Sequence, residues 1–154
     1  MKQLILILFL FPIFLSAHTI KGKVVRVSDG DTVVVLDSTN TQYRVRLDGI
    51  DCPEKGQPFG KKATDFVKNI TSKSEFVTIV WKKKDRYGRI LGYLIVDEVN
   101  VNKELLRNGL AWHYKHFNKD KELADLEQQA KDKKLNIWSE SNPIEPYYWR
   151  KGKR

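Results

Sequence analysis

The chain has 154 residues, 41% of them hydrophobic, a length and composition that fit one compact domain. Its 28 basic and 19 acidic side chains give a net charge of +9, which favours polyanionic partners such as nucleic acid or anionic lipid. A basic surface can also serve solubility alone, so charge by itself does not choose among these roles. The single cysteine, Cys52, excludes an intrachain disulfide and a thiolate zinc site.

The N-terminus has the pattern of a signal peptide. Lys2 is followed by an apolar run of 14 residues from Leu4 to Ala17, whereas a membrane-spanning helix needs about 20. We therefore expect cleavage before His18, with residues 1–17 as the signal peptide, residues 18–154 as the domain, and export to the periplasm or the medium. The alternative is an uncleaved N-terminal membrane anchor. After cleavage we expect a monomer without stable membrane association.

Five segments have the alternating or β-branched pattern of strands. The first two flank a turn at residues 28–30 and form a predicted hairpin, and a second turn at residues 37–40 leads to the third. In the third strand Arg44 and Arg46 alternate with apolar residues and therefore share one face. The predicted strands lie at residues 19–36, which hold the hairpin, and at residues 43–47, 75–81 and 89–96, the last two joined by a charged turn.

Three segments have the helical spacing of apolar residues. The first helix is predicted over residues 59–70, the second over residues 102–108 with Gly109 closing it, and the third over residues 121–135. Strands with one interposed helix and terminal helices predict an α+β fold, a five-stranded Greek-key β-barrel (an OB-fold) with about three α-helices. The open face of such a barrel binds oligonucleotides.

Three carboxylates fall at turns or strand ends, where barrels display binding sites: Asp31, Asp51 and Glu54. Hard cations such as calcium prefer oxygen ligands, so two carboxylates, a backbone carbonyl and waters would form an open site. Arg46 lies on the third strand and Arg89 follows the charged turn, and guanidinium groups bind phosphate oxygens bidentately. Any one of these side chains could simply be solvated or paired on the surface, so only their combination carries the prediction.

Five motifs in one order resemble those of the thermonuclease (staphylococcal nuclease-like) family. They are DGDT at residues 29–32, RLDGIDCPE at 46–54, DRYGR at 85–89, VNKELLRNGLA at 101–111 and KLNIWSE at 134–140. The likeness covers essentially all of residues 18–154. It implies a secreted, calcium-dependent endo- and exonuclease that cleaves phosphodiester bonds of DNA and RNA and leaves 3′-phosphate ends. A cleft that stacks a base needs that base unpaired, which favours single strands.

The resemblance also implies roles for individual residues. A divalent cation and fixed guanidinium groups stabilise the negative charge that develops on phosphoryl oxygens during in-line attack. An ionised carboxylate suits a proton acceptor, so Glu54 would orient or deprotonate the attacking water. The implied assignments are the calcium ligands Asp31, Asp51 and the backbone carbonyl of Cys52, the phosphate-binding residues Arg46 and Arg89, and the water-activating Glu54.

Aromatic residues are expected beside the substrate. Tyr87 resembles a family tyrosine next to the phosphate, and Arg86 beside it is expected to bind substrate. Tyr114 resembles a tyrosine on which a base stacks, although Phe117 or His116 could take this place.

Two other functions remain open. The first is a non-catalytic nucleic-acid-binding module on the same barrel, against which the presence of all five charged residues argues. The second is a surface protein that binds a host or lipid partner through its basic face, which leaves the carboxylates unexplained. We expect the C-terminal tail, residues 143–150, to pack on the body rather than to catalyse.

Overall fold

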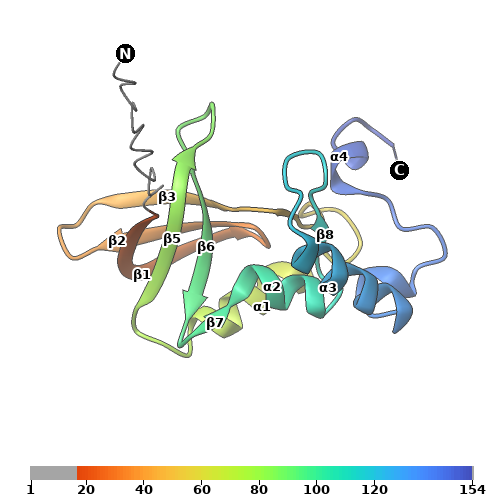
Figure 1. Cartoon of the computed structure of the whole chain (residues 1–154), viewed down its shortest axis with the longest axis horizontal. Helices are drawn as coiled ribbons and strands as arrows, with labels where there is room; N and C mark the ends of the chain where they lie inside the picture. The colour runs from red at the N-terminus through yellow and green to blue at the C-terminus, as the bar shows by residue number, and fades with distance from the viewer. Residues whose placement is uncertain (1–16, 154) are drawn as a thin grey trace, which may run out of the picture.

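Five strands close into a barrel, and the longer helices gather at one end of it (Figure 1). The computed structural model describes residues 17–153. Neighbouring strands are antiparallel in the order β3-β2-β1-β5-β6, and a parallel pairing of β3 with β6 closes the barrel. This confirms the predicted α+β architecture with a five-stranded OB-type barrel. The barrel strands are β1 (His18–Asp29), β2 (Thr32–Asp37), β3 (Gln42–Leu47), β5 (Val77–Lys84) and β6 (Ile90–Val96).

Strand β1 is long enough to pair with two neighbours. Its first residues, up to Gly22, pair with β5, and the stretch from Gly22 to Asp29 pairs with β2. A Cβ atom at Gly22 would lie 2.3 Å from the carbonyl oxygen of Leu36, so a residue without a side chain is required where the two pairings meet. Two register shifts, one between Val24 and Arg26 and one between Val27 and Asp29, interrupt the pairing with β2 before the turn that carries Asp31.

Helices α1 and α2 pack on the barrel, and α3 packs on α2. α2 starts where the Asn100 side chain accepts a hydrogen bond from Lys103 N–H, and α3 starts where Asp120 accepts one from Glu122 N–H. The predicted helices are present as α1 (Gly60–Thr71), α2 (Val101–Arg107) and α3 (Lys121–Asp132). Shorter elements were not predicted: β4 (Ile50–Asp51), β7 (Val99–Asn100), β8 (Trp112–His113), the 3-10 helix η1 (Asn136–Ser139) and α4 (Pro146–Trp149).

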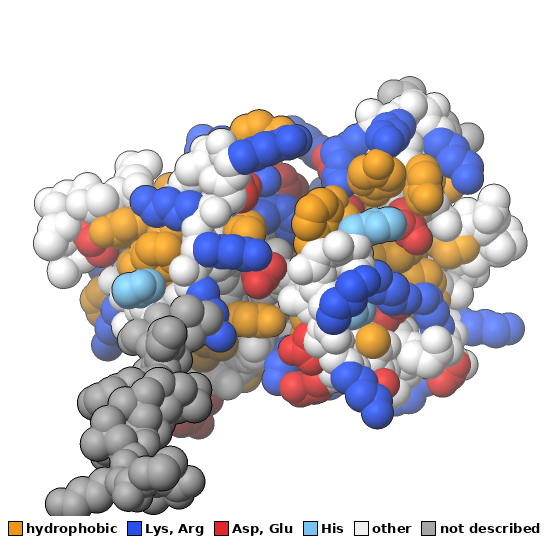
Figure 2. Space-filling model, turned by 45° about the horizontal axis from the view of Figure 1, so that its top comes forward, with side chains coloured by type: hydrophobic (Ala, Val, Ile, Leu, Met, Phe, Trp, Pro, Cys, Tyr) orange, Lys and Arg blue, Asp and Glu red, His pale blue; other side chains and the backbone are white. Residues whose placement is uncertain are grey.

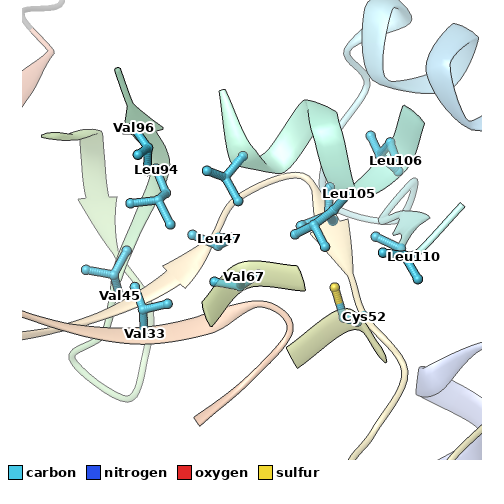
Figure 3. Close-up of a cluster of buried hydrophobic side chains, with 14 of the residues drawn as sticks. Val33, Val45, Leu47, Cys52, Val67, Leu94, Val96, Leu105, Leu106 and Leu110 are labelled. Carbon is cyan, nitrogen blue, oxygen red and sulfur yellow. The ribbon is translucent and has the colours of Figure 1, made fainter. Parts of the chain in front are cut away.

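The core lies between the barrel and the helices (Figure 3). Val33 and Val45 from the barrel share one buried cluster with Val67 of α1 and Leu105 of α2, and all four are 0% exposed. The side chain of Cys52 belongs to the same cluster. Removal of this apolar surface from water anchors the loop that contains Cys52 to the body.

Several element boundaries differ from the sequence prediction by one to three residues, and the largest differences are at the ends of β5 and α3. β5 extends to Lys84 instead of ending at Trp81, because Lys83 and Lys84 continue the pairing with β6 after a bulge. α3 ends at Asp132, before a left-handed backbone at Lys134 (φ 52°). The expected signal peptide lies, apart from Ala17, outside the described residues. Within residues 17–153 we find no helix with the length and hydrophobicity needed to span a bilayer.

Candidate active site

One arginine joins the two aspartates that the sequence singled out as cation ligands. Arg46 Nη1 lies 3.0 Å from Asp31 Oδ2, and Arg46 Nη2 lies 2.9 Å from Asp51 Oδ1. Asp31 comes from the β1–β2 turn, Arg46 from β3, and Asp51 from β4, so three segments converge. Asp31 and Asp51 are 7% and 2% exposed. The two carboxylates therefore face one point, as the sequence prediction required.

The position of Arg46 follows from the closure of the barrel. In β3 it pairs with Thr32 of β2 on one side and with Leu91 of β6 on the other. Burial by itself lowers the pKa of Arg46, but the charges of Asp31 and Asp51 more than offset this and raise the pKa above its ordinary value. The guanidinium stays charged.

Cys52 fixes the turn that carries Asp31. The Cys52 N–H donates to Asp31 Oδ2 at 2.7 Å. A Cβ atom at Gly30 would lie 2.9 Å from the Cβ of Cys52, so glycine permits this close approach. Burial raises the pKa of the Cys52 thiol well above its usual range, which keeps the sulfur protonated and unsuited to bind a metal. A ligand from Cys52 would have to be its backbone carbonyl.

The acidic groups crowd one another despite their arginine partners. Burial and the nearby Asp31 raise the pKa of Asp29 to about 6. Burial also raises the pKa of Asp51, although hydrogen bonds and charges from Arg150 and Arg46 act in the opposite direction. A divalent cation would stabilise the ionised forms of these groups.

The donor chemistry fits a hard cation. The candidate ligands offer only oxygen, as calcium prefers. Among residues 17–153 no group of three or more His, Cys, Asp or Glu side chains is arranged to hold a metal ion. The expected ligand set contains two carboxylate side chains and one backbone carbonyl, so it has fewer side-chain ligands than such a group. It leaves coordination positions for water and phosphate.

The β5–β6 turn carries the second basic group of the site. Asp85 organises this turn: its carboxylate accepts hydrogen bonds from the N–H groups of Tyr87 and Arg89 and pairs with Arg89 Nε at 2.7 Å. The guanidinium groups of Arg86 and Arg89 lie 4.8 and 5.7 Å from the centre of the Tyr87 ring. Tyr87 itself is 67% exposed, at the edge of the cleft.

A cleft of about 490 Å³ brings the predicted residues together. Figure 2 shows the hollow with basic side chains on both sides and acidic side chains inside it. Cys52 lies behind Asp31, with its side chain in the core. The residues that line the cleft include Asp31, Arg46, Asp51, Glu54, Arg86, Tyr87, Arg89 and Tyr114, together with Asp29, Thr32, Tyr147 and Arg150.

Tyr114 also lines an adjacent cleft of about 380 Å³. Phe117 lies on this second cleft as well, 76% exposed, with its ring centre 4.9 Å from that of Tyr114. The ring centre of His116 lies 6.0 Å from that of Tyr147 and 6.4 Å from that of Tyr114. Tyr114 and Phe117 are thus both placed to stack a base.

The sequence interpretation missed Arg150 in the site. The tail does pack on the body, where Gln57 Nε2 donates to the Ile144 carbonyl at 2.6 Å. It also carries Arg150 to Asp51 and to Glu54, whose Oε1 lies 2.6 Å from Arg150 Nη1. No local pattern in the tail marks this contact. Asp29 was missed too, although its place two residues before Asp31 in a tight turn signals a second nearby acid.

Comparison with known proteins gives one consistent family. Residues 44–140 match the family model described as "Staphylococcal nuclease homologue". The chain is similar to an "Uncharacterized endonuclease" of Escherichia coli, 41% identical over 150 residues and 97% of each chain. It is also similar to a "Micrococcal nuclease" of Shigella flexneri, 37% identical with 87% of this chain and 82% of the relative covered. A third relative, an "Uncharacterized endonuclease" of Haemophilus influenzae, is 37% identical over 84% of this chain and 72% of its own.

Proposed function

Because the chain belongs to the staphylococcal nuclease family and is a phosphodiesterase, we propose that it is an exported, calcium-dependent nuclease acting on DNA and RNA. We further propose that it cuts within strands and at their ends, prefers single strands and leaves 3′-phosphates. One observation carries this proposal: Arg46 joins Asp31 and Asp51 at the floor of a cleft that Glu54 and Arg89 also line.

Calcium bound by Asp31, Asp51 and the Cys52 carbonyl would supply positive charge opposite the scissile phosphate. Arg46 stands between the two aspartates, and its positive charge would also attract the phosphate. Arg89, fixed by Asp85, would contact the phosphate from the β5–β6 turn. Both guanidinium groups are held before substrate binds, so little reorganisation is needed as charge develops on the phosphoryl oxygens.

Glu54 is the carboxylate best suited to take a proton from water. Its side chain is 37% exposed on the cleft and pairs with Arg150, which is itself 41% exposed, whereas the side chains of Asp31 and Asp51 are 10% and 3% exposed and share Arg46. Exposure gives water access to the carboxylate, whose oxygen atoms can accept the proton. We propose that Glu54 orients or deprotonates the attacking water.

The preference for single strands is supported by the aromatic side of the cleft. Tyr114 and Phe117 lie side by side beside the phosphate-binding groups, and Phe117 is largely exposed. A base can stack on either ring only when it is unpaired. The same rings would accept any base, so the proposal includes both DNA and RNA.

The experiment is incubation of the purified protein with heat-denatured DNA, with duplex DNA and with RNA, each in calcium and in excess chelator. We expect shortening of all three in calcium, fastest for the single strands, and no cutting in chelator. A phosphatase-sensitive 3′ end on the products would support the proposed cleavage position. Binding without any shortening would instead support a non-catalytic nucleic-acid-binding module.

Export rests on the N-terminal sequence, and it has a separate test. The full chain is expressed in a Gram-negative host, and the protein in the periplasm and medium is sized by mass spectrometry. We expect a product that begins at His18. A full-length product in the membrane fraction would support the uncleaved anchor instead.

A further inference from the structure

The cleft has two walls, and each carries a tyrosine and an arginine. One wall is the β5–β6 turn, with Arg86 and Tyr87. The other is the C-terminal tail, where Tyr147 lies in α4 and Arg150 follows that helix. In Figure 1 the β5–β6 turn and α4 project on the same side of the molecule. The acidic floor, with Asp31 and the other carboxylates, lies between these walls.

The tail wall is held in place at both of its ends. Upstream, the Ile144 carbonyl accepts the hydrogen bond from Gln57. Downstream, Arg150 spans two carboxylates: its Nη1 and Nη2 lie 3.2 and 3.1 Å from Asp51 Oδ1 and Oδ2, and Nη1 also donates to Glu54. The Arg150 side chain is 41% exposed, so part of the guanidinium faces the cleft.

Arg150 and a cation at Asp51 would compete for the same oxygens. Asp51 Oδ2 accepts from Arg150, and Asp51 Oδ1 accepts from Arg150 and Arg46 together. A divalent ion bound to either oxygen would repel the Arg150 guanidinium. The side chain would then turn into the cleft, where the phosphates of a bound strand are the next acceptors. A planar guanidinium with two free N–H groups matches phosphate oxygens well.

We propose that Arg150 is a substrate-binding residue whose guanidinium exchanges Asp51 for a phosphate of the bound strand. The C-terminal tail is on this view the second wall of the nucleic-acid groove. The proposal rests on the proposed function, since it requires both a cation and a nucleic acid in the cleft.

The test measures strand binding without cleavage. Glu54→Gln serves as the background, and Arg150→Gln and Arg150→Lys are added to it. Affinity for a short fluorescent single-stranded DNA is measured by anisotropy in calcium at several salt concentrations. Arg150→Gln should weaken binding about tenfold. It should also lower the slope of log affinity against log salt by about 0.7, the contribution of one phosphate contact in a single strand. Arg150→Lys should recover part of the affinity and most of the slope.

Lys153→Gln is the matched control, because Lys153 is exposed, lies three residues further along the tail and contacts the Tyr148 ring instead of a carboxylate. It should change neither the affinity nor the slope by a comparable amount. Calcium binding to each variant is measured by calorimetry, and Arg150→Gln should bind calcium at least as tightly as the background. Thermal unfolding checks that each variant is folded.

Several results would overturn the proposal. Unchanged or tighter strand binding by Arg150→Gln would show that Arg150 does not contact the phosphate. An equal loss of affinity in Lys153→Gln would show that only the total positive charge of the tail matters. Weaker calcium binding by Arg150→Gln would mean that the loss of strand affinity results from poorer calcium binding instead. If the background itself bound no strand, the proposed function would fail together with this inference, whereas equal binding by all variants would remove the role of Arg150 alone.

Discussion

Arg150 and Asp51 stand 99 positions apart in the chain and form a two-point ion pair, with nitrogen–oxygen distances of 3.2 and 3.1 Å. Arg46, which precedes Asp51 in the chain, contacts the same carboxylate through its Nη2 atom at 2.9 Å. Asp51 is 2% exposed, so a buried charge here depends on both guanidinium groups. The stability of the cleft floor and the proposed binding of a cation therefore involve the same atoms.

Replacement of Arg46 by glutamine should destabilise the protein. Asp31 and Asp51 would lose their shared partner while remaining buried, which costs about 3 kcal/mol. Added calcium should restore part of this loss by supplying positive charge to the same carboxylates. Urea unfolding with and without calcium measures both effects. Arg44→Gln on the same strand, where the side chain is exposed, should unfold like the parent protein.

If calcium binds the folded site as proposed, it should stabilise the parent protein against unfolding. At a free calcium concentration 100-fold above Kd the gain should be about 2.7 kcal/mol. Asp51→Asn should lose most of this gain, and the exposed Asp125→Asn should keep it. Thermal unfolding across a calcium series provides the measurement. An equal gain in both variants would place the bound cation away from Asp51.

Glu54→Gln should retain nucleic-acid binding and lose most turnover. Loss of a positioned proton acceptor lowers kcat by about 100- to 10,000-fold. The amide keeps the size of the side chain, so affinity for a single strand should change little. Steady-state cleavage and anisotropy together separate the two effects, with the exposed Glu140→Gln as a control. Near-parental turnover would remove Glu54 from the proposed mechanism.

Single substitutions can decide which aromatic ring stacks a base. Loss of a stacking platform weakens strand binding by about 1–3 kcal/mol. Tyr114→Ala should show this loss if Tyr114 is the platform, with Phe117→Ala close to parental; the reverse order would assign Phe117. His116→Ala should have the smaller effect, because His116 lies against Tyr147 and outside the second cleft. The comparison uses one single-stranded DNA at fixed salt.

Glu127 should link folding to acid pH. Burial raises its pKa, but hydrogen bonds from Lys115, Lys131 and the His113 N–H outweigh this and lower the pKa below the ordinary 4.5. A lowered folded pKa stabilises the protein above about pH 4.5. This stability is lost as the pH falls through the folded value.

Glu127→Gln should therefore cost about 1 kcal/mol at neutral pH, because the two partly exposed lysines lose an ionised partner but can still be solvated. The difference from the parent protein should shrink as the pH falls through the lowered pKa. Unfolding free energies measured between neutral pH and about pH 3 test this, with the exposed Glu98→Gln as a control. A constant difference across this range would contradict the role given to Glu127.

The barrel was predictable because its signals are local. β-Branched residues clustered around the turn before Asp31 predicted the β1–β2 hairpin. The alternating pattern of β3 predicted which face of that strand carries Arg46. The end of β5 was not predictable in the same way. Lys82, Lys83 and Lys84 are exposed in a projecting hairpin, and an exposed strand has no apolar alternation to distinguish it from a charged turn.

Most of the site was predictable because each of its residues lies in a recognisable motif at or next to the end of a strand. Adjacent strands of a barrel bring such ends close together in space. Asp31, Arg46 and Asp51 accordingly converge. Arg150 was not predictable: its partners lie 96 and 99 positions away, and its side chain is positioned by tertiary packing of the tail. Arginine near a chain end has many possible partners, and local sequence does not select one.

The Cys52 N–H donates a hydrogen bond of 2.7 Å to the carboxylate of Asp31. This bond fixes the positions of two separate loops relative to each other. A substitution at Asp31 releases the backbone that also carries Asp51, and a change in that backbone disturbs Asp31 in return. Variants at these positions should therefore show non-additive effects in double-mutant cycles. A substitution in either loop should therefore alter the position of the other loop, even where the substituted residue lies outside the cleft.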